Sequence, residues 1–150
     1  MKTLLLATAL LLTPLANADQ LSIDLGVNTT HIESKANQNE DNKLIAVEYR
    51  TGNHGLNASS FKNTYSNQTY TVGGSYSLVE FEYVELSLLY GVVKGYEKGQ
   101  LDTVIADDVG VYVAPRITVK YQATDKITLK VSTQLFGNAV VTTAGVGYSF

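Results

Sequence analysis

The sequence contains no cysteine and no tryptophan, and it has two prolines and two histidines among its 150 residues. Without cysteine the chain forms no disulfides and offers no thiolate ligands, and two histidines are too few for a persuasive metal site. We therefore expect neither a bound metal nor another cofactor. The formal net charge of −3 argues against nucleic acid as a partner, because a phosphate backbone attracts positively charged proteins.

Long apolar runs are also scarce, and the one that is present lies at the N-terminus. Lys2 supplies a positive charge, residues 4–12 are mostly leucine and alanine, and Ala16 and Ala18 form an A-x-A cleavage site. This pattern predicts a signal peptide over residues 1–18 that is removed from the mature protein. The run is shorter than the roughly 20 residues of a membrane-spanning helix, and no longer run follows it. We expect a single domain over residues 19–150.

Tyrosine, glycine and β-branched residues are frequent, and apolar side chains alternate with polar or small ones almost throughout. In the first such segment, apolar residues at 21, 23, 25 and 27 alternate with Ser22, Asp24, Gly26 and Asn28. A period of two is typical of β-strands that have two different faces. It predicts eight strands, over residues 20–28, 44–50, 56–62, 69–78, 85–93, 109–121, 126–136 and 140–150.

The connections between these strands alternate in length. Longer loops at 31–43, 64–68 and 94–108 alternate with short turns at 52–55, 80–84 and 122–126, and a tight turn at Gly137-Asn138 ends the series. Longer loops at one end and short turns at the other are typical of outer-membrane barrels. The sequence therefore predicts an all-β fold, an eight-stranded antiparallel transmembrane β-barrel of a Gram-negative outer membrane, with both termini periplasmic. A soluble, secreted barrel that binds a ligand is the alternative.

The last predicted strand ends on Phe150, the final residue. In lipid the last strand must pair with the first, because an open edge would leave backbone groups without hydrogen bonds. A terminal strand that ends in phenylalanine also resembles the C-terminal signature that the outer-membrane assembly machinery reads. We therefore expect this machinery as a partner.

Eight strands enclose room for side chains or one small ligand, and not for an aqueous channel. The residues that face inward near the periplasmic end, the lower half of the barrel, are mostly charged: Asp24, Glu48, Arg50, Glu85, Arg116, Lys120 and Lys130. Because a buried charge needs a partner, this half is predicted to be a plug of paired charges. A proton or ion path is the alternative.

The inward positions of the upper half are small or apolar. Such side chains suit a hydrocarbon tail, and they predict an acyl-chain pocket lined by Leu44, Ala46, Leu89, Gly91, Val93, Tyr112, Ala114 and Val141. The alternative is a well-packed interior in which Tyr112 fills the space that the glycines leave.

Several short segments resemble the lipid A palmitoyltransferase family and its wider relatives: THIES, QNEDN, NHGLNASSFKNTYSN, LLYGVVKGY and VAP. That family moves a palmitoyl chain from a phospholipid to lipid A at the outer-membrane surface. The resemblance implies a catalytic role for His31, and it places the family's aspartate and serine at Asn63 and Thr64. It places the family's Asn-Glu pair at Asn39-Glu40.

The chain departs from the family pattern at two of these positions. Asn63 cannot carry the negative charge that stabilises an imidazolium, although its amide could orient the ring. Thr64 keeps a hydroxyl, which a neighbouring histidine can activate as a general base. Glu40 or Asp41 could supply the missing carboxylate. The family also uses prolines that loosen strand pairing for lipid access, and here Pro115 is the single strand interruption.

Three functions are compatible with these observations. In the first, a phospholipid reaches the barrel sideways near Pro115, and His31 assists acyl transfer to a lipid A hydroxyl. In the second, the protein is a non-catalytic surface barrel, an adhesin, resistance or membrane-structural protein, that acts through the loops at 31–43 and 94–108. In the third, it binds or carries a lipid or small apolar molecule. Phospholipid and lipopolysaccharide are the expected membrane partners, and the sequence leaves open a bacterial or a phage origin.

Overall fold

The computed structural model describes residues 19–33, 38–100 and 103–150, and its regular elements are all β-strands. The predicted signal peptide, residues 1–18, lies outside the described residues. Within the described ranges, no helix is long and apolar enough to cross a bilayer.

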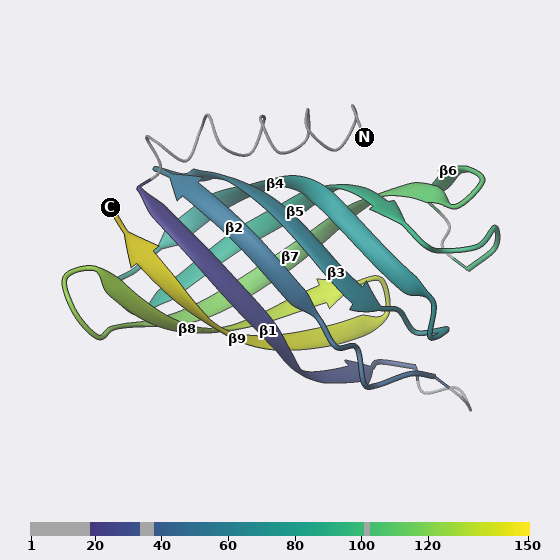
Figure 1. Ribbon diagram of the computed structural model, residues 1–150, viewed down its shortest axis with the longest axis horizontal. Helices are drawn as coiled ribbons and strands as arrows, with labels where there is room; N and C mark the ends of the chain where they lie inside the picture. The colour runs from purple at the N-terminus through teal and green to yellow at the C-terminus, as the bar shows by residue number, and fades with distance from the viewer. Residues whose placement is uncertain (1–18, 34–37, 101–102) are drawn as a thin grey trace, which may run out of the picture.

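Nine strands occur in the described residues: β1 (Gln20–His31), β2 (Ile45–Thr51), β3 (His54–Lys62), β4 (Gln68–Glu80), β5 (Val84–Lys94), β6 (Val104–Ala106), β7 (Val109–Gln122), β8 (Ile127–Phe136) and β9 (Ala139–Ser149). Eight of them form one antiparallel barrel, in which neighbours along the chain pair and β1 closes on β9 (Figure 1). The predicted eight-stranded fold is confirmed. The three-residue β6, which the sequence did not predict, pairs with the start of β7 inside the loop at 94–108.

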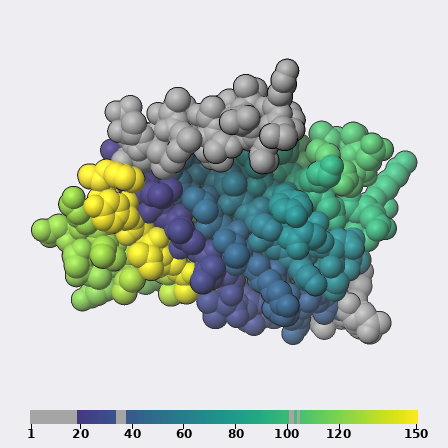
Figure 2. Space-filling model, viewed as in Figure 1, coloured from purple at the N-terminus to yellow at the C-terminus, as the bar shows by residue number. Residues whose placement is uncertain are grey.

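The two ends of the barrel differ as the loop lengths predict. The start of β1, the end of β9 and the turns at 52–53, 81–83 and 123–126 lie at one end, on the left in Figure 1. The described parts of the connections at 32–44, 63–67 and 95–108, with the tight turn at 137–138, lie at the other. We call these the lower and the upper end. In Figure 2 the last strand, in yellow, lies directly beside the first, in purple, so the wall is continuous where the chain closes.

The two faces of the wall differ in chemistry, and β7 illustrates the difference. Its odd-numbered positions, among them Val113, Ile117 and Val119, are exposed on the outside, while Tyr112, Ala114 and Arg116 are buried within. An apolar outer face around a mixed interior is typical of a barrel surrounded by lipid.

The alternation in β1 is interrupted by a β-bulge between Gly26 and Asn28. Below the bulge Ser22 and Asp24 are buried, whereas above it Thr29 and His31 are buried and Asn28 is exposed. The prediction that Asn28 shares a face with Asp24 is therefore wrong, because the extra residue of a bulge reverses the facing of every residue beyond it. As a consequence, the side chain of His31 points into the barrel.

The wall is less completely paired near Pro115. β5 pairs with β7 from Lys94 and Val109 downward, but the ladder between β7 and β8 begins at Arg116 opposite Gln134. Among the described residues, 112–115 of β7 have no ladder partner on the β8 side. Proline has no N–H to donate, which agrees with the predicted weak pairing at this position. Above Arg116 the upper wall therefore lacks backbone pairing between β7 and β8, and we call this break in the ladder the notch.

Candidate functional site

The predicted charges of the lower half meet in the barrel interior. Glu48 receives hydrogen bonds from Arg116 at 2.7 Å and from Arg50 at 2.9 Å, and Arg50 also reaches Glu85 at 2.5 Å. Lys130 pairs with Asp24 at 2.9 Å, and Lys120 lies between Glu85 and Glu80. We call this set the ionic layer: Asp24, Glu48, Arg50, Glu80, Glu85, Arg116, Lys120 and Lys130.

The centre of the ionic layer is well buried, and the charges of the layer are paired. Glu48, Glu85 and Arg116 are 4 %, 3 % and 7 % exposed. The predicted plug is confirmed, and Glu80, an exposed residue at the end of β4 that was not predicted, pairs with Lys120. The layer therefore closes the lower half of the bore with side chains, which are held by ion pairs and not by backbone hydrogen bonds.

Aromatic side chains fill much of the upper half. Phe136 packs against two apolar clusters, and its ring centroid lies 5.8 Å from Phe61, 5.2 Å from Tyr112 and 6.4 Å from Tyr96. Phe136 was not among the predicted pocket residues, although it has the same even parity as the inward residue Lys130 of the same strand. Tyr96 comes from the loop above β5, and its burial raises the pKa of the phenol, with a smaller contribution from Tyr65.

The Tyr112 side chain reaches from β7 along the inner face of the wall to β3. Asn57, Gly73, Gly91 and Tyr112 lie in one row across β3, β4, β5 and β7. The Tyr112 hydroxyl donates to Asn57 Oδ1 at 3.1 Å, so the side chain crosses the two glycine positions between them. This arrangement agrees with the alternative that Tyr112 fills the space left by the glycines.

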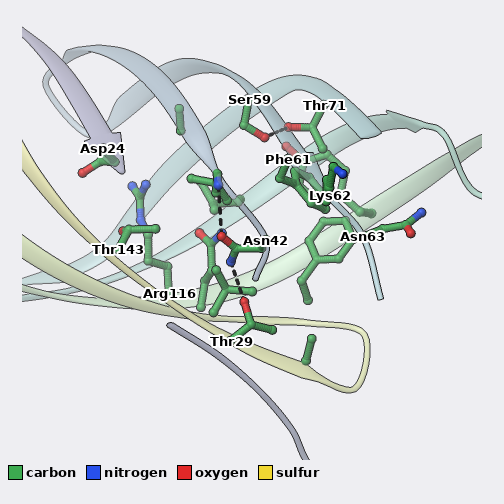
Figure 3. Close-up of a pocket in the computed structure, with 18 of the residues that line it drawn as sticks. Asp24, Thr29, Asn42, Ser59, Phe61, Lys62, Asn63, Thr71, Arg116 and Thr143 are labelled. Atoms are coloured by element: carbon green, nitrogen blue, oxygen red, sulfur yellow. Dashed lines mark hydrogen bonds between the residues drawn. The ribbon is translucent and has the colours of Figure 1, made fainter. Parts of the chain in front are cut away.

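A cavity of about 60 Å³ remains inside the barrel. Five of the predicted pocket residues line it: Leu44, Ala46, Leu89, Tyr112 and Val141. Val93 and Ala114 lie in the cluster behind Leu89, and Gly91 lies in the wall opposite Gly73. Figure 3 shows Asp24 and Arg116 at one end of the cavity and Phe61 and Asn63 at the other. The space suits on the order of four water molecules, so a palmitoyl chain would have to displace aromatic side chains.

Two of the predicted catalytic residues meet at the upper end. His31 Nε2 lies 3.0 Å from Thr64 Oγ1, although the residues are 33 positions apart, and His31 is 6 % exposed. Thr64 also lines the cavity. Among the described residues, no group hydrogen-bonds His31 Nδ1. If Thr64 donates to Nε2, the ring is poised as a base, and its Nδ1–H lacks the orienting acceptor of a complete triad.

The third predicted residue, Asn63, is engaged elsewhere. Its Oδ1 accepts from the backbone N–H groups of Tyr65 at 2.9 Å and Asn67 at 3.1 Å. Its Nδ2 donates to the carbonyl of Gly95 at 3.0 Å. In this arrangement the Asn63 amide shapes the 63–67 turn and fastens it to the loop beside Tyr96, rather than orienting His31.

The first loop holds the Asn63-Thr64 segment in place. The Asn39 backbone N–H donates to the Thr64 carbonyl at 2.8 Å, and Asn39 Nδ2 donates to the Asn63 carbonyl at 3.2 Å. Glu40 and Asp41 are exposed, and Asp41 pairs with Lys43 at 3.7 Å, so neither supplies a carboxylate to His31 here.

Asn42 is a further cavity residue that was not among the predicted site residues. It is 6 % exposed, lines the cavity and donates to Thr29 Oγ1 (Figure 3). It continues the inward parity of Leu44 and Ala46, a signal that could have found it. Among the described residues, no group of three or more His, Cys, Asp or Glu side chains is arranged to hold a metal ion.

No family model and no curated protein matches the chain. The fold matches solved structures of small transmembrane barrels. The outer-membrane protein Ail of Yersinia pestis in a lipid nanodisc is 15% identical, with a TM-score of 0.50 over 88% of this chain and 99% of that one. A de novo designed transmembrane β-barrel is 13% identical, with a TM-score of 0.50 over 89% of this chain and 98% of that one. Neisserial surface protein A is 15% identical at a TM-score of 0.46, over 87% of this chain and 95% of that one.

These likenesses define a class of protein by its fold. The chain has the closed eight-stranded fold of small outer-membrane β-barrels. At this level of identity they show the fold alone, and the resemblance to the lipid A palmitoyltransferase family stays a prediction.

Proposed function

We propose that the protein is an outer-membrane barrel that acts at its upper, extracellular end and does not transport solutes through its bore. The observation that carries this proposal is the closure of the bore by the ionic layer, above which the Phe136 cluster leaves a cavity of only about 60 Å³. An eight-stranded barrel has no room for a channel beside such side chains.

The upper loops offer a recognisable surface. Within the described residues of the loops at 31–43 and 94–108, six acidic side chains outnumber three lysines: Glu33, Glu40, Asp41, Glu97, Asp107 and Asp108 against Lys43, Lys94 and Lys98. Two isoleucines, Ile32 and Ile105, are 65% and 69% exposed. This combination favours a partner that is basic or partly apolar, because an anionic one would be repelled.

Conductance across a planar lipid bilayer tests the closed bore. The purified barrel, verified as folded by its heat-modifiable migration in gel electrophoresis, should leave the electrical resistance of the bilayer unchanged. A stable, porin-like conductance of the unmodified protein would contradict the proposal.

A second candidate function is the transfer of a phospholipid acyl chain to lipid A, or the binding of such a chain in the upper barrel. Three observations favour it: the His31–Thr64 contact of 3.0 Å, the notch in the wall beside Pro115, and the apolar side chains of Leu44, Leu89 and Val141 in the cavity wall. The notch gives a lipid a lateral route to the interior that avoids the ionic layer.

The chemistry would be a direct acyl transfer. The acceptor hydroxyl attacks the carbonyl carbon of the phospholipid ester and gives its proton to His31 Nε2. The ester C–O bond breaks, and the departing glycerol oxygen takes the proton back from His31, which leaves an acylated acceptor and a lysophospholipid. Thr64 would position the acceptor, and Asn63 would fix the turn that carries Thr64.

Mass spectrometry of lipid A tests this second candidate. Gram-negative cells that lack their own palmitoyltransferase would express the protein, its His31→Ala variant, or the control His54→Ala, which changes an exposed histidine at the lower end. An added acyl chain with the unmodified protein and with His54→Ala, lost with His31→Ala, would support transfer. Lipid A of unchanged mass, with the barrel folded in the membrane, would count against it.

A further inference from the structure

Two cavities meet the ionic layer from opposite sides. The upper cavity, of about 60 Å³, reaches down to Asp24, Glu48 and Arg116. The lower cavity, of about 620 Å³, reaches up to Arg50, Glu85 and Lys120. Glu48 and Arg50 contact each other at 2.9 Å. The ion pairs of this layer therefore separate the upper cavity from the lower cavity.

The charges within this layer balance. Four acids, Asp24, Glu48, Glu80 and Glu85, face four bases, Arg50, Arg116, Lys120 and Lys130. The partners come from six strands. Two of the contacts, Arg116 to Glu48 and Arg50 to Glu85, join strands that are not neighbours in the sheet and therefore cross the bore. The bore is therefore closed by side chains alone.

Two buried polar atoms at the upper cavity have no hydrogen-bond partner among the described residues. Asp24 is 5% exposed and uses one carboxylate oxygen to bind Lys130, while no described residue hydrogen-bonds its Oδ1. Asn57, which lines the same cavity, has an Nδ2 without a partner among the described residues. A buried polar atom without a partner favours contact with water or an ion.

We propose that the ionic layer is the closure of a latent ion path along the bore, and that separating one of its pairs admits small monovalent ions. The proposal goes beyond the proposed function, which needs only a closed bore in the unmodified protein. Loss of one partner leaves a buried charge of the opposite sign, and that charge draws in water and counter-ions.

The sign of the charge that loses its partner should determine whether the variant conducts cations or anions. Removing Arg116 leaves an excess negative charge around Glu48 and removes the side chain that separates the two cavities. Neutralising Glu48 leaves an excess positive charge around Arg50 and Arg116. The first change should favour cations and the second anions.

Single-channel recording of the folded, heat-modifiable protein in planar bilayers tests this, with reversal potentials measured across a KCl gradient. Arg116→Ala should conduct with cation preference, and Glu48→Gln should conduct with anion preference. The control Lys94→Ala removes an exposed ion pair with Asp108 at the upper end, 3.6 Å long, and should stay closed. Opposite selectivities separate an ion path from a leak around a distorted barrel.

Two results would overturn the proposal. Folded Arg116→Ala and Glu48→Gln barrels that stay as closed as the unmodified protein would exclude a path, and equal selectivity in both would assign the current to a non-specific leak. If Arg116→Ala does not fold, Arg116→Gln replaces it with the same expected cation preference. Conductance of the unmodified protein would instead contradict the closed bore of the proposed function, so the two failures are distinguishable.

Discussion

The Tyr112 hydroxyl on β7 donates a hydrogen bond of 3.1 Å to Oδ1 of Asn57 on β3, across the positions of Gly91 and Gly73. Two strands lie between donor and acceptor, so the contact links parts of the wall that no backbone ladder joins. The glycines make this possible, because neither carries a side chain that would obstruct the phenol. The filling of the upper barrel thus depends on a tyrosine and two glycines together.

Substitutions of Tyr112 should therefore lower the free energy of unfolding, by an amount that depends on whether the hydroxyl or the whole ring is removed. Tyr112→Phe removes one hydrogen bond and should lower the free energy of unfolding by about 1 kcal/mol. Tyr112→Ala also opens a cavity over the glycines and should cost about 3–5 kcal/mol. Denaturant unfolding of the barrel from lipid vesicles measures both. The control Tyr121→Ala, on the exposed outer face, should cost less than about 1 kcal/mol, and equal losses at the two sites would contradict this account.

Gly73 should not tolerate even a methyl group. An added Cβ would lie 1.9 Å from the Tyr90 carbonyl oxygen and 2.8 Å from Gly91 Cα, and backbone atoms cannot rotate away. Gly73→Ala should cost roughly 3 kcal/mol or prevent folding. At Gly147 the nearest atoms belong to the flexible end of Gln20, at 2.9 Å, so Gly147→Ala should fold normally. The yield of heat-modifiable protein distinguishes the two, and a normal yield for Gly73→Ala would show that β4 and β5 can separate.

The two histidines should differ in chemical reactivity. His31 is 6 % exposed and contacts Thr64. His54 is exposed at the start of β3, where its ring centroid lies 5.0 Å from that of Tyr76. Diethyl pyrocarbonate should modify His54 of the folded barrel many times faster than His31, and the rates should converge after denaturation. Peptide mass spectrometry follows each site. Rapid modification of His31 in the folded protein would mean that the upper end is more open than the described contacts imply.

The orientation in the membrane can be tested cleanly, because the chain has no cysteine. Lys98 is exposed at the upper end and Asp125 is exposed in a turn at the lower end. A membrane-impermeant maleimide should label Lys98→Cys on intact cells and Asp125→Cys only after the outer membrane is opened. The reverse pattern would place both termini outside the cell and remove the upper loops from the cell surface.

Much of the fold follows from local patterns in the sequence. Alternation with a period of two predicts the strands, and the loop lengths predict which ends lie together. The inward parity also predicts the ionic layer, because Glu48, Arg50 and Arg116 occupy inward positions of their strands and buried charges must pair. The same parity, extended by one step, reaches Asn42 and Phe136.

The candidate catalytic contact could not be predicted in this way. His31 has the parity of the outward residues of β1, and only the bulge at Gly26–Asn28 turns it inward toward Thr64. Asn63 illustrates the same point, because a residue expected beside a histidine instead fastens two loops through Gly95. Bulges and loop contacts depend on how strands far apart in the sequence pack together. A pattern within one strand does not predict this packing.

The sequence by itself thus determined the number of barrel strands, the closure of the last strand on the first, and the separation of a charged lower half from an uncharged upper half. Those features rest on the facing of each side chain, which the two-residue period of a strand fixes locally. The tertiary structure decided that the upper half is filled by Tyr96, Tyr112 and Phe136, and that His31 meets Thr64. These contacts depend on side chains crossing the bore and on one added residue in β1, which become defined only when the barrel closes.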